Sequence, residues 1–87
     1  MDVIKLDHLD TVVFYDERGS IVYMHDFATS NGGVHPSQQQ REKLARESAA
    51  RAFVKLEKLS VLHIDPKILD PRKRYRVEPE SKRLLSL

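Results

Sequence analysis

The chain has 87 residues, of which 40% are hydrophobic and 32% charged, and its net charge at neutral pH is +2. These values are typical of one small globular domain and exclude an intrinsically disordered chain. The chain has no cysteine, which excludes disulfides and cysteine nucleophiles, and no apolar run reaches the roughly 18 residues of a membrane span. The acidic N-terminus lacks the pattern of a signal peptide, so we expect a cytoplasmic protein.

The first predicted elements are two strands that form a hairpin. Residues 1–10 are a poorly specified lead-in, whereas residues 11–16 (TVVFYD) are β-branched and aromatic, which predicts a strand. Residues 20–27 (SIVYMHDF) predict a second strand by the same reasoning. Between them, DERG predicts a type I turn that begins at Asp16 and is closed by Gly19 in the left-handed conformation.

This turn also predicts which side chains share each face of the hairpin. If Asp16 faces Ser20, Tyr15 faces Ile21 and the pairing continues in step along both strands. Because strand side chains alternate between faces, one face is wholly apolar. It carries Val12, Phe14, Val22 and Met24. The other face has apolar side chains with polar tips, and carries Val13, Tyr15, Ile21, Tyr23 and His25.

Residues 37–58 predict a long helix. Ser37 and Gln40 fit a capping box, although Pro36 as the first helical residue is equally compatible. Apolar residues follow at helical spacing in a single stripe: Ala45, Ala49, Ala52, Phe53 and Leu56. Two pairs of opposite charge, Glu42–Arg46 and Glu47–Arg51, support the helix on its solvent side. The loop before it, residues 28–36, contains a glycine pair but lacks a phosphate-loop spacing, so we expect no anion site there.

The last third of the chain predicts three short strands. Residues 59–65 (LSVLHID) form the third strand, which Pro66 ends. Residues 74–79 (RYRVEP) alternate basic and apolar side chains and predict a half-buried fourth strand with Tyr75 and Val77 inward. The terminal ESKRLLSL predicts a turn at residues 80–82 and a short fifth strand.

This order predicts an α+β two-layer sandwich of the ββαββ type, in which one long helix packs on one face of a mostly antiparallel four- or five-stranded sheet. We expect the strand order 2-1-3-4. One helix covers only one face, so the face with polar tips remains uncovered. His63 joins it from the third strand, and Arg74 and Arg76 join it from the fourth. A surface of this composition is typical of an interface.

Metal and catalytic chemistry have little support. The four histidines, His8, His25, His35 and His63, have no close ligand spacing, so we expect no metal site. The sequence has no nucleophile elbow and no phosphate-binding motif. We therefore expect no enzyme, no catalytic residue, no cofactor and no small-molecule substrate.

We expect instead a small non-enzymatic interaction module that self-associates, as a dimer, through the uncovered sheet face. The expected interface residues are Val13, Tyr15, Ile21, Tyr23, His25, His63, Arg74 and Arg76. The arginines lie at its rim, where they can meet Asp26 or Glu17 of the other subunit. In another form of this hypothesis, residues 84–87 (LLSL) pair with another chain by strand addition.

The alternative function is single-stranded nucleic-acid binding by the same face. The tyrosines would stack on bases, and Arg74 and Arg76 would contact phosphates. Basic residues prevail over acidic ones in residues 66–87, which favours this hypothesis, but residues 1–30 are acidic and oppose it.

Overall fold

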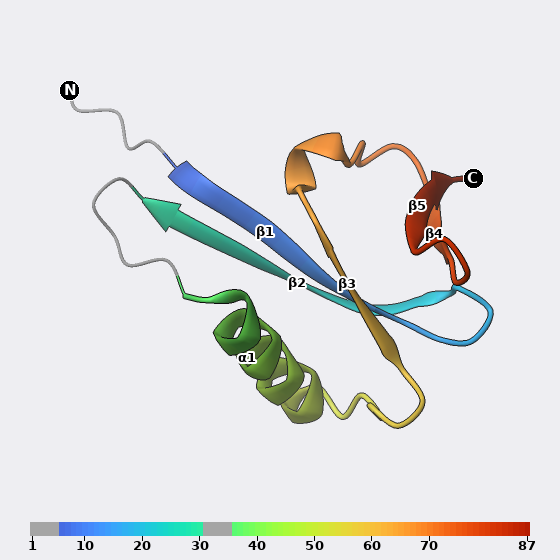
Figure 1. Cartoon of the computed structure of the whole chain (residues 1–87), viewed down its shortest axis with the longest axis horizontal. Helices are drawn as coiled ribbons and strands as arrows, with labels where there is room; N and C mark the ends of the chain where they lie inside the picture. The colour runs from blue at the N-terminus through green and yellow to red at the C-terminus, as the bar shows by residue number, and fades with distance from the viewer. Residues whose placement is uncertain (1–5, 31–35) are drawn as a thin grey trace.

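The structure, a computed structural model, describes residues 6–30 and 36–87, and the observations below concern these residues. The elements in chain order are β1 (Leu6–Tyr15), β2 (Ile21–Ser30), α1 (Gln38–Arg51), β3 (Ser60–Ile64), the 3₁₀ helix η1 (Pro66–Ile68), β4 (Tyr75–Glu78) and β5 (Arg83–Ser86). Figure 1 shows this α+β arrangement, which confirms the expected class and the expected order of elements. The first strand begins at Leu6, within the expected lead-in.

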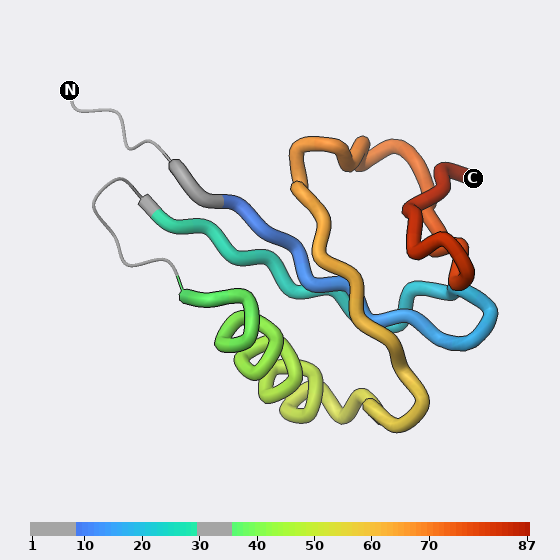
Figure 2. Tube along the Cα trace, viewed as in Figure 1, coloured from blue at the N-terminus to red at the C-terminus, as the bar shows by residue number. Residues whose placement is uncertain are grey.

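The strands form two separate antiparallel sheets. One sheet has the order β2-β1-β3, as expected, but within residues 6–30 and 36–87 β4 and β5 pair only with each other. The expected single sheet of four or five strands is therefore wrong. After β3, Pro66 begins η1, and the chain then crosses to the β1–β2 turn (Figure 2). There, the backbone N–H of Val77 donates to the carbonyl of Gly19 at 2.8 Å.

The β1–β2 turn has the expected chemistry. Gly19 has φ +83°, and its N–H donates to the Asp16 carbonyl at 3.0 Å. The Asp16 side chain accepts hydrogen bonds from the backbone N–H groups of Arg18 and Ser20, both at 2.9 Å. The turn thus satisfies its own polar groups and presents Gly19 to β4.

The hairpin register differs from the expectation by one residue. Tyr15 pairs with Ile21 as expected, but Phe14 then pairs with Tyr23 because the ladder is irregular at this point. Val22 is the extra residue of this β-bulge. Side chains of a strand alternate between the two faces of its sheet. The extra residue therefore places each side chain of β2 from Tyr23 onward on the face opposite to the expected one. The expected grouping of faces is therefore wrong for Tyr23, Met24 and His25.

Each face of the three-stranded sheet has its own apolar cluster. The cluster beneath α1 is formed by Val12, Phe14 and Ala45, with Tyr23, Phe27, Leu56, Leu59 and Val61 packed against it. The cluster on the opposite face is formed by Val13, Tyr15, Ile64 and Val77, with Ile21, Leu62, Leu69 and Leu84 packed against it. The chain after β3 therefore covers much of the face that the sequence analysis left open, and that expectation is wrong.

The helix is shorter than expected. Its start is as expected: Ser37 caps it, and Ser37 and Gln40 form the reciprocal capping box. It ends at Arg51 rather than at residue 58, because the backbone N–H groups of Phe53 and Val54 donate to Ala50 and Ala49 in a C-terminal capping arrangement. Ala45 and Ala49 are buried as expected, but Phe53 lies outside the buried stripe.

Gly19→Ala tests the contact between the turn and β4. A Cβ atom at residue 19 would lie 1.8 Å from the Val77 carbonyl oxygen, and φ +83° disfavours side chains. We expect the free energy of unfolding in urea to fall by about 2–4 kcal/mol. The matched control is Ser20→Ala, whose exposed side chain should contribute less than about 0.5 kcal/mol. Equal effects of the two substitutions would contradict this contact.

Candidate interaction surface

The eight expected interface residues do not share one face. Val13 and Tyr15 are 0% and 3% exposed, and they are buried with Ile21 and Val77 on the face away from α1. Tyr23 packs on the α1 side, where its hydroxyl lies 2.7 Å from the Ser48 hydroxyl oxygen.

The remaining expected residues are divided between the α1 side and the C-terminal hairpin. His25 pairs with Val12 on the α1 side, and its ring meets the Phe27 ring edge-on at 4.7 Å. His63 also pairs with Val12 and faces α1. Arg74 and Arg76 are exposed on the β4–β5 hairpin. The expected partner Asp26 accepts a hydrogen bond from Thr11 at 2.6 Å within the chain.

A polar network connects the first turns of α1 to the sheet. The Nδ1 atom of His63 lies 2.8 Å from Asp10, and its Nε2 atom lies 2.8 Å from Glu42. Arg41 donates to the same Asp10 oxygen at 2.7 Å. Because ionised carboxylates only accept hydrogen bonds, a doubly protonated His63 ring satisfies both contacts.

Asp10 is the most sheltered member of this network, with only 8% of its surface exposed. Burial raises the pKa of Asp10, but hydrogen bonds from His63 and Arg41, with their positive charges, outweigh burial and hold this pKa below its ordinary value. The ionised form of Asp10 therefore stabilises the fold.

The network links the start of α1 to β1 and β3. The four side chains bond to one another, and in the described residues no group of three or more histidine, aspartate or glutamate side chains has an arrangement that could hold a metal ion. Sequence reasoning missed Asp10, Arg41 and Glu42, because Asp10 lay in the supposed lead-in and Glu42 was assigned to Arg46. Glu47 and Arg51 do approach within 4.0 Å as expected.

Phe53 is the most exposed large apolar side chain among those described. It is 94% exposed and follows the helix with φ +61°, the left-handed conformation that favours glycine. Its backbone N–H caps the helix, but its ring contributes nothing to either apolar cluster. A side chain of this size in this position is a candidate for contact with another molecule.

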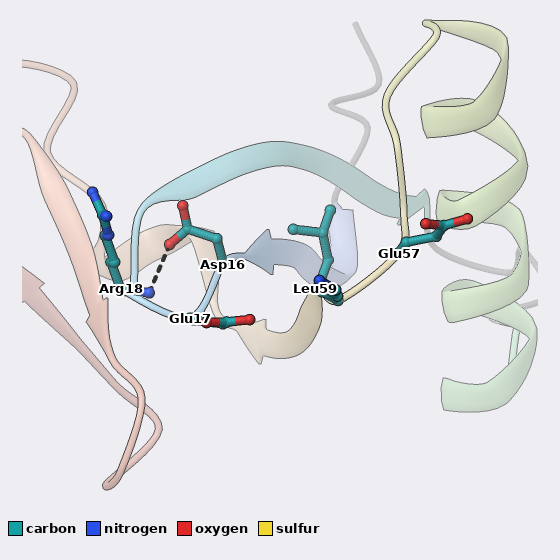
Figure 3. A pocket seen from close by; sticks show the side chains of 6 residues that line it. Asp16, Glu17, Arg18, Glu57 and Leu59 are labelled. Atoms are coloured by element: carbon teal, nitrogen blue, oxygen red, sulfur yellow. Dashed lines mark hydrogen bonds between the residues drawn. The ribbon is translucent and has the colours of Figure 1, made fainter.

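Among the hollows in the described residues, one lies at the β1–β2 turn and another on α1. One, of about 290 Å³, lies between the β1–β2 turn and the chain after α1, and Asp16, Glu17, Arg18, Glu57, Lys58 and Leu59 line it. Its carboxylates do not converge, since Glu57 points away from Asp16 (Figure 3). The other, of about 370 Å³, lies on the outer side of α1, and Pro36, Gln40, Lys43, Leu44 and Glu47 line it. Leu44 is 43% exposed and gives this second hollow an apolar wall.

The C-terminal hairpin has a basic outer face. Its exposed basic side chains, together with those of the preceding segment, are Lys67, Arg72, Lys73, Arg74, Arg76, Lys82 and Arg83. Within residues 6–30 and 36–87, only Arg72 of this group forms an ion pair, at 3.5 Å from Asp70. Tyr75 is half-buried, and its hydroxyl accepts a hydrogen bond from the Asp70 N–H. This face therefore offers charge without an exposed aromatic ring.

No protein-family model, curated protein or solved structure matches the chain. In the ranges that the structure covers, no helix has the length and apolar character required to cross a bilayer.

Asp10→Asn tests the polar network. We expect it to lower the free energy of unfolding by about 2–3 kcal/mol at pH 7, because ionised hydrogen bonds to His63 and Arg41 are lost. The folded pKa of Asp10 is lowered, so its contribution is complete above the unfolded pKa of about 3.9 and is lost as pH falls through the folded pKa. The difference between wild type and variant should therefore shrink below about pH 4 in urea titrations. Glu80→Gln, at an exposed acid, should show no comparable difference at any pH.

Proposed function

We propose that the chain is a small non-enzymatic interaction module that self-associates as a homodimer. The observation that carries this proposal is the position of Phe53, which is 94% exposed in a left-handed backbone conformation. Such positions are sparsely populated by bulky residues, and where they occur they often belong to binding sites.

The energetics favour a role for Phe53 outside the protomer. The left-handed conformation costs roughly 1 kcal/mol for a residue with a Cβ atom, and glycine would make the same capping hydrogen bonds without this cost. Burying a phenylalanine side chain is worth roughly 1.5–3 kcal/mol, but Phe53 buries almost none of its surface within the protomer. Association with another molecule would bury this ring and offset the strain.

The proposed contact surface is not the one expected from the sequence. Tyr15 and Tyr23 are engaged inside the protomer, so neither serves as an anchor for a second subunit. The helix end with Phe53 takes this role. The β2 edge is a second exposed surface, because β2 pairs only with β1 in the described chain and exposes Val22 and Met24.

Nucleic-acid binding is the second candidate function, and the unpaired basic side chains of the C-terminal hairpin favour it. Arg74, just before β4, and Arg76, within it, are both exposed, and the Arg76 guanidinium donates a hydrogen bond to the Arg18 carbonyl at 3.3 Å. Base stacking on Tyr15 or Tyr23 has no support, since both rings are packed inside the protomer. This candidate is therefore reduced to contacts with phosphates.

Phe53→Gly separates association from folding. In dilute protein, we expect the free energy of unfolding to rise by roughly 0.5–1 kcal/mol, because glycine relieves the left-handed strain. We also expect the dimer dissociation constant, measured by sedimentation equilibrium, to rise at least tenfold. This is the order of magnitude that the free energy of burying one phenylalanine side chain predicts.

Lys58→Gly is the matched control, because Lys58 also has a positive φ, of 63°, but no aromatic ring. It should stabilise the fold to a similar extent and leave the dissociation constant unchanged. A wild-type chain that remains monomeric at high micromolar concentration would refute the proposed function.

The double substitution Arg74→Ala with Arg76→Ala tests the second candidate. If the hairpin contacts phosphates, fluorescence anisotropy with a labelled single-stranded RNA should show weaker binding. The slope of log affinity against log salt should fall by about 1.4, from two lost contacts at about 0.7 each. Lys55→Ala with Lys58→Ala removes the same charge elsewhere. An equal loss in both double variants would assign the effect to net charge and reject the hairpin as the site.

A further inference from the structure

We infer that the outer face of the β4–β5 hairpin binds the surface of an anionic phospholipid bilayer. The hairpin lies at one end of the molecule, away from α1 (Figure 1). A contact of this kind lies in the plane of the lipid headgroups and needs no membrane-spanning segment. It involves a different part of the molecule from the proposed self-association and does not depend on it.

The inner face of the hairpin fixes its orientation. Val77, which is 0% exposed, and Leu84 pack in the cluster that contains Val13 and Tyr15. The Val77 N–H also donates to the Gly19 carbonyl at 2.8 Å. Because strand side chains alternate between two faces, the neighbours of Val77 and Leu84 point the other way. The fold therefore anchors one face of the hairpin and presents the other.

The outer face combines arginines with leucines. Alternation and strand register place six side chains on it: Arg74, Arg76, Arg83, Leu85, Leu87 and Glu78. Arg76 pairs directly with Leu85 across the hairpin. Arg74 precedes β4, and its carbonyl accepts a hydrogen bond from the Leu87 N–H at 2.7 Å, which continues the pairing. Leu85 and Leu87 are 37% and 74% exposed, so apolar surface lies among the positive charges.

The charge of this face suits a partner that carries phosphates. Within residues 6–30 and 36–87, no ion pair involves Arg74, Arg76 or Arg83. Glu78 is the one acid among the six side chains, so the outer face has a net positive charge. Guanidinium groups match the geometry of phosphate oxygens and bind them in pairs of hydrogen bonds. The face is therefore complementary to an anionic phosphate surface.

The leucines favour a bilayer over a nucleic acid. A nucleic-acid backbone offers phosphates, but it has no apolar layer to receive Leu85 and Leu87. The hydroxyl of Tyr75, on the inner side, accepts from the Asp70 N–H at 2.7 Å, so this ring is not presented for base stacking. An anionic bilayer offers lipid phosphates at its surface and acyl chains directly beneath them. One surface then satisfies both the arginines and the leucines.

Vesicle sedimentation tests the contribution of charge. We expect the chain to bind vesicles of phosphatidylcholine with phosphatidylserine and not vesicles of phosphatidylcholine alone. Arg74→Ala with Arg76→Ala should weaken binding about 25-fold, since each basic residue at an anionic surface contributes about fivefold. The matched control is Lys43→Ala with Lys55→Ala, which removes the same charge from exposed positions elsewhere and should leave binding nearly unchanged.

Leucine substitutions test insertion into the lipid. Leu85→Ser with Leu87→Ser should weaken vesicle binding at least tenfold, by the order of magnitude of the apolar surface removed from water. It should leave any binding to a labelled single-stranded RNA unchanged. Leu44→Ser is the matched control, because Leu44 is 43% exposed on α1, and it should not change vesicle binding. Circular dichroism and urea unfolding should show that all three chains keep the wild-type fold.

The outcomes that would overturn the inference are distinct. Equal vesicle binding by wild type and the double leucine variant would reduce the contact to charge and reject insertion. Binding to RNA without binding to anionic vesicles would assign the face to nucleic acid. Binding to neither would leave the face without the proposed partner. None of these results would affect the proposed self-association, which sedimentation equilibrium measures in the absence of lipid.

Discussion

Val22 is one extra residue in the ladder between β1 and β2, and the side chains that meet α1 depend on it. Without this bulge, Met24 would face the helix and Tyr23 would lie on the opposite face. With it, Tyr23 lies beneath α1, where its hydroxyl reaches Ser48, and the small side chains of Ala45 and Ala49 leave room for its ring. A single backbone irregularity thus determines how the helix and the sheet fit together.

The polar network complements this packing at the other end of the helix. Asp10, His63 and Glu42 come from three elements far apart in sequence, and their hydrogen bonds fix the first turns of α1 over β1 and β3. No buried side-chain nitrogen or oxygen among the described residues lacks a hydrogen-bond partner. Apolar contacts therefore hold the middle of α1 and directional polar contacts hold its start, so its outer side is presented in a fixed orientation.

The end of the helix contrasts with this satisfied interior. The chain caps α1 with Phe53, although glycine suits the left-handed position better, and leaves the ring in solvent. Residues that break a local rule without a gain inside the fold are expected at functional positions.

The sequence by itself determined the elements whose signals are local. The DERG turn, the Ser37–Gln40 capping box, the inward Tyr75 and Val77 and the short fifth strand are all as expected, because neighbouring residues fix each of them. Tertiary structure decided the rest. The bulge at Val22, the helix end at Arg51 and the placement of β4 against Gly19 depend on contacts between distant segments, and alternation in the sequence does not encode a one-residue shift. The site followed the same division: Tyr15 and Tyr23, expected as anchors for a second subunit, pack inside the protomer, and Phe53, expected inside, is exposed.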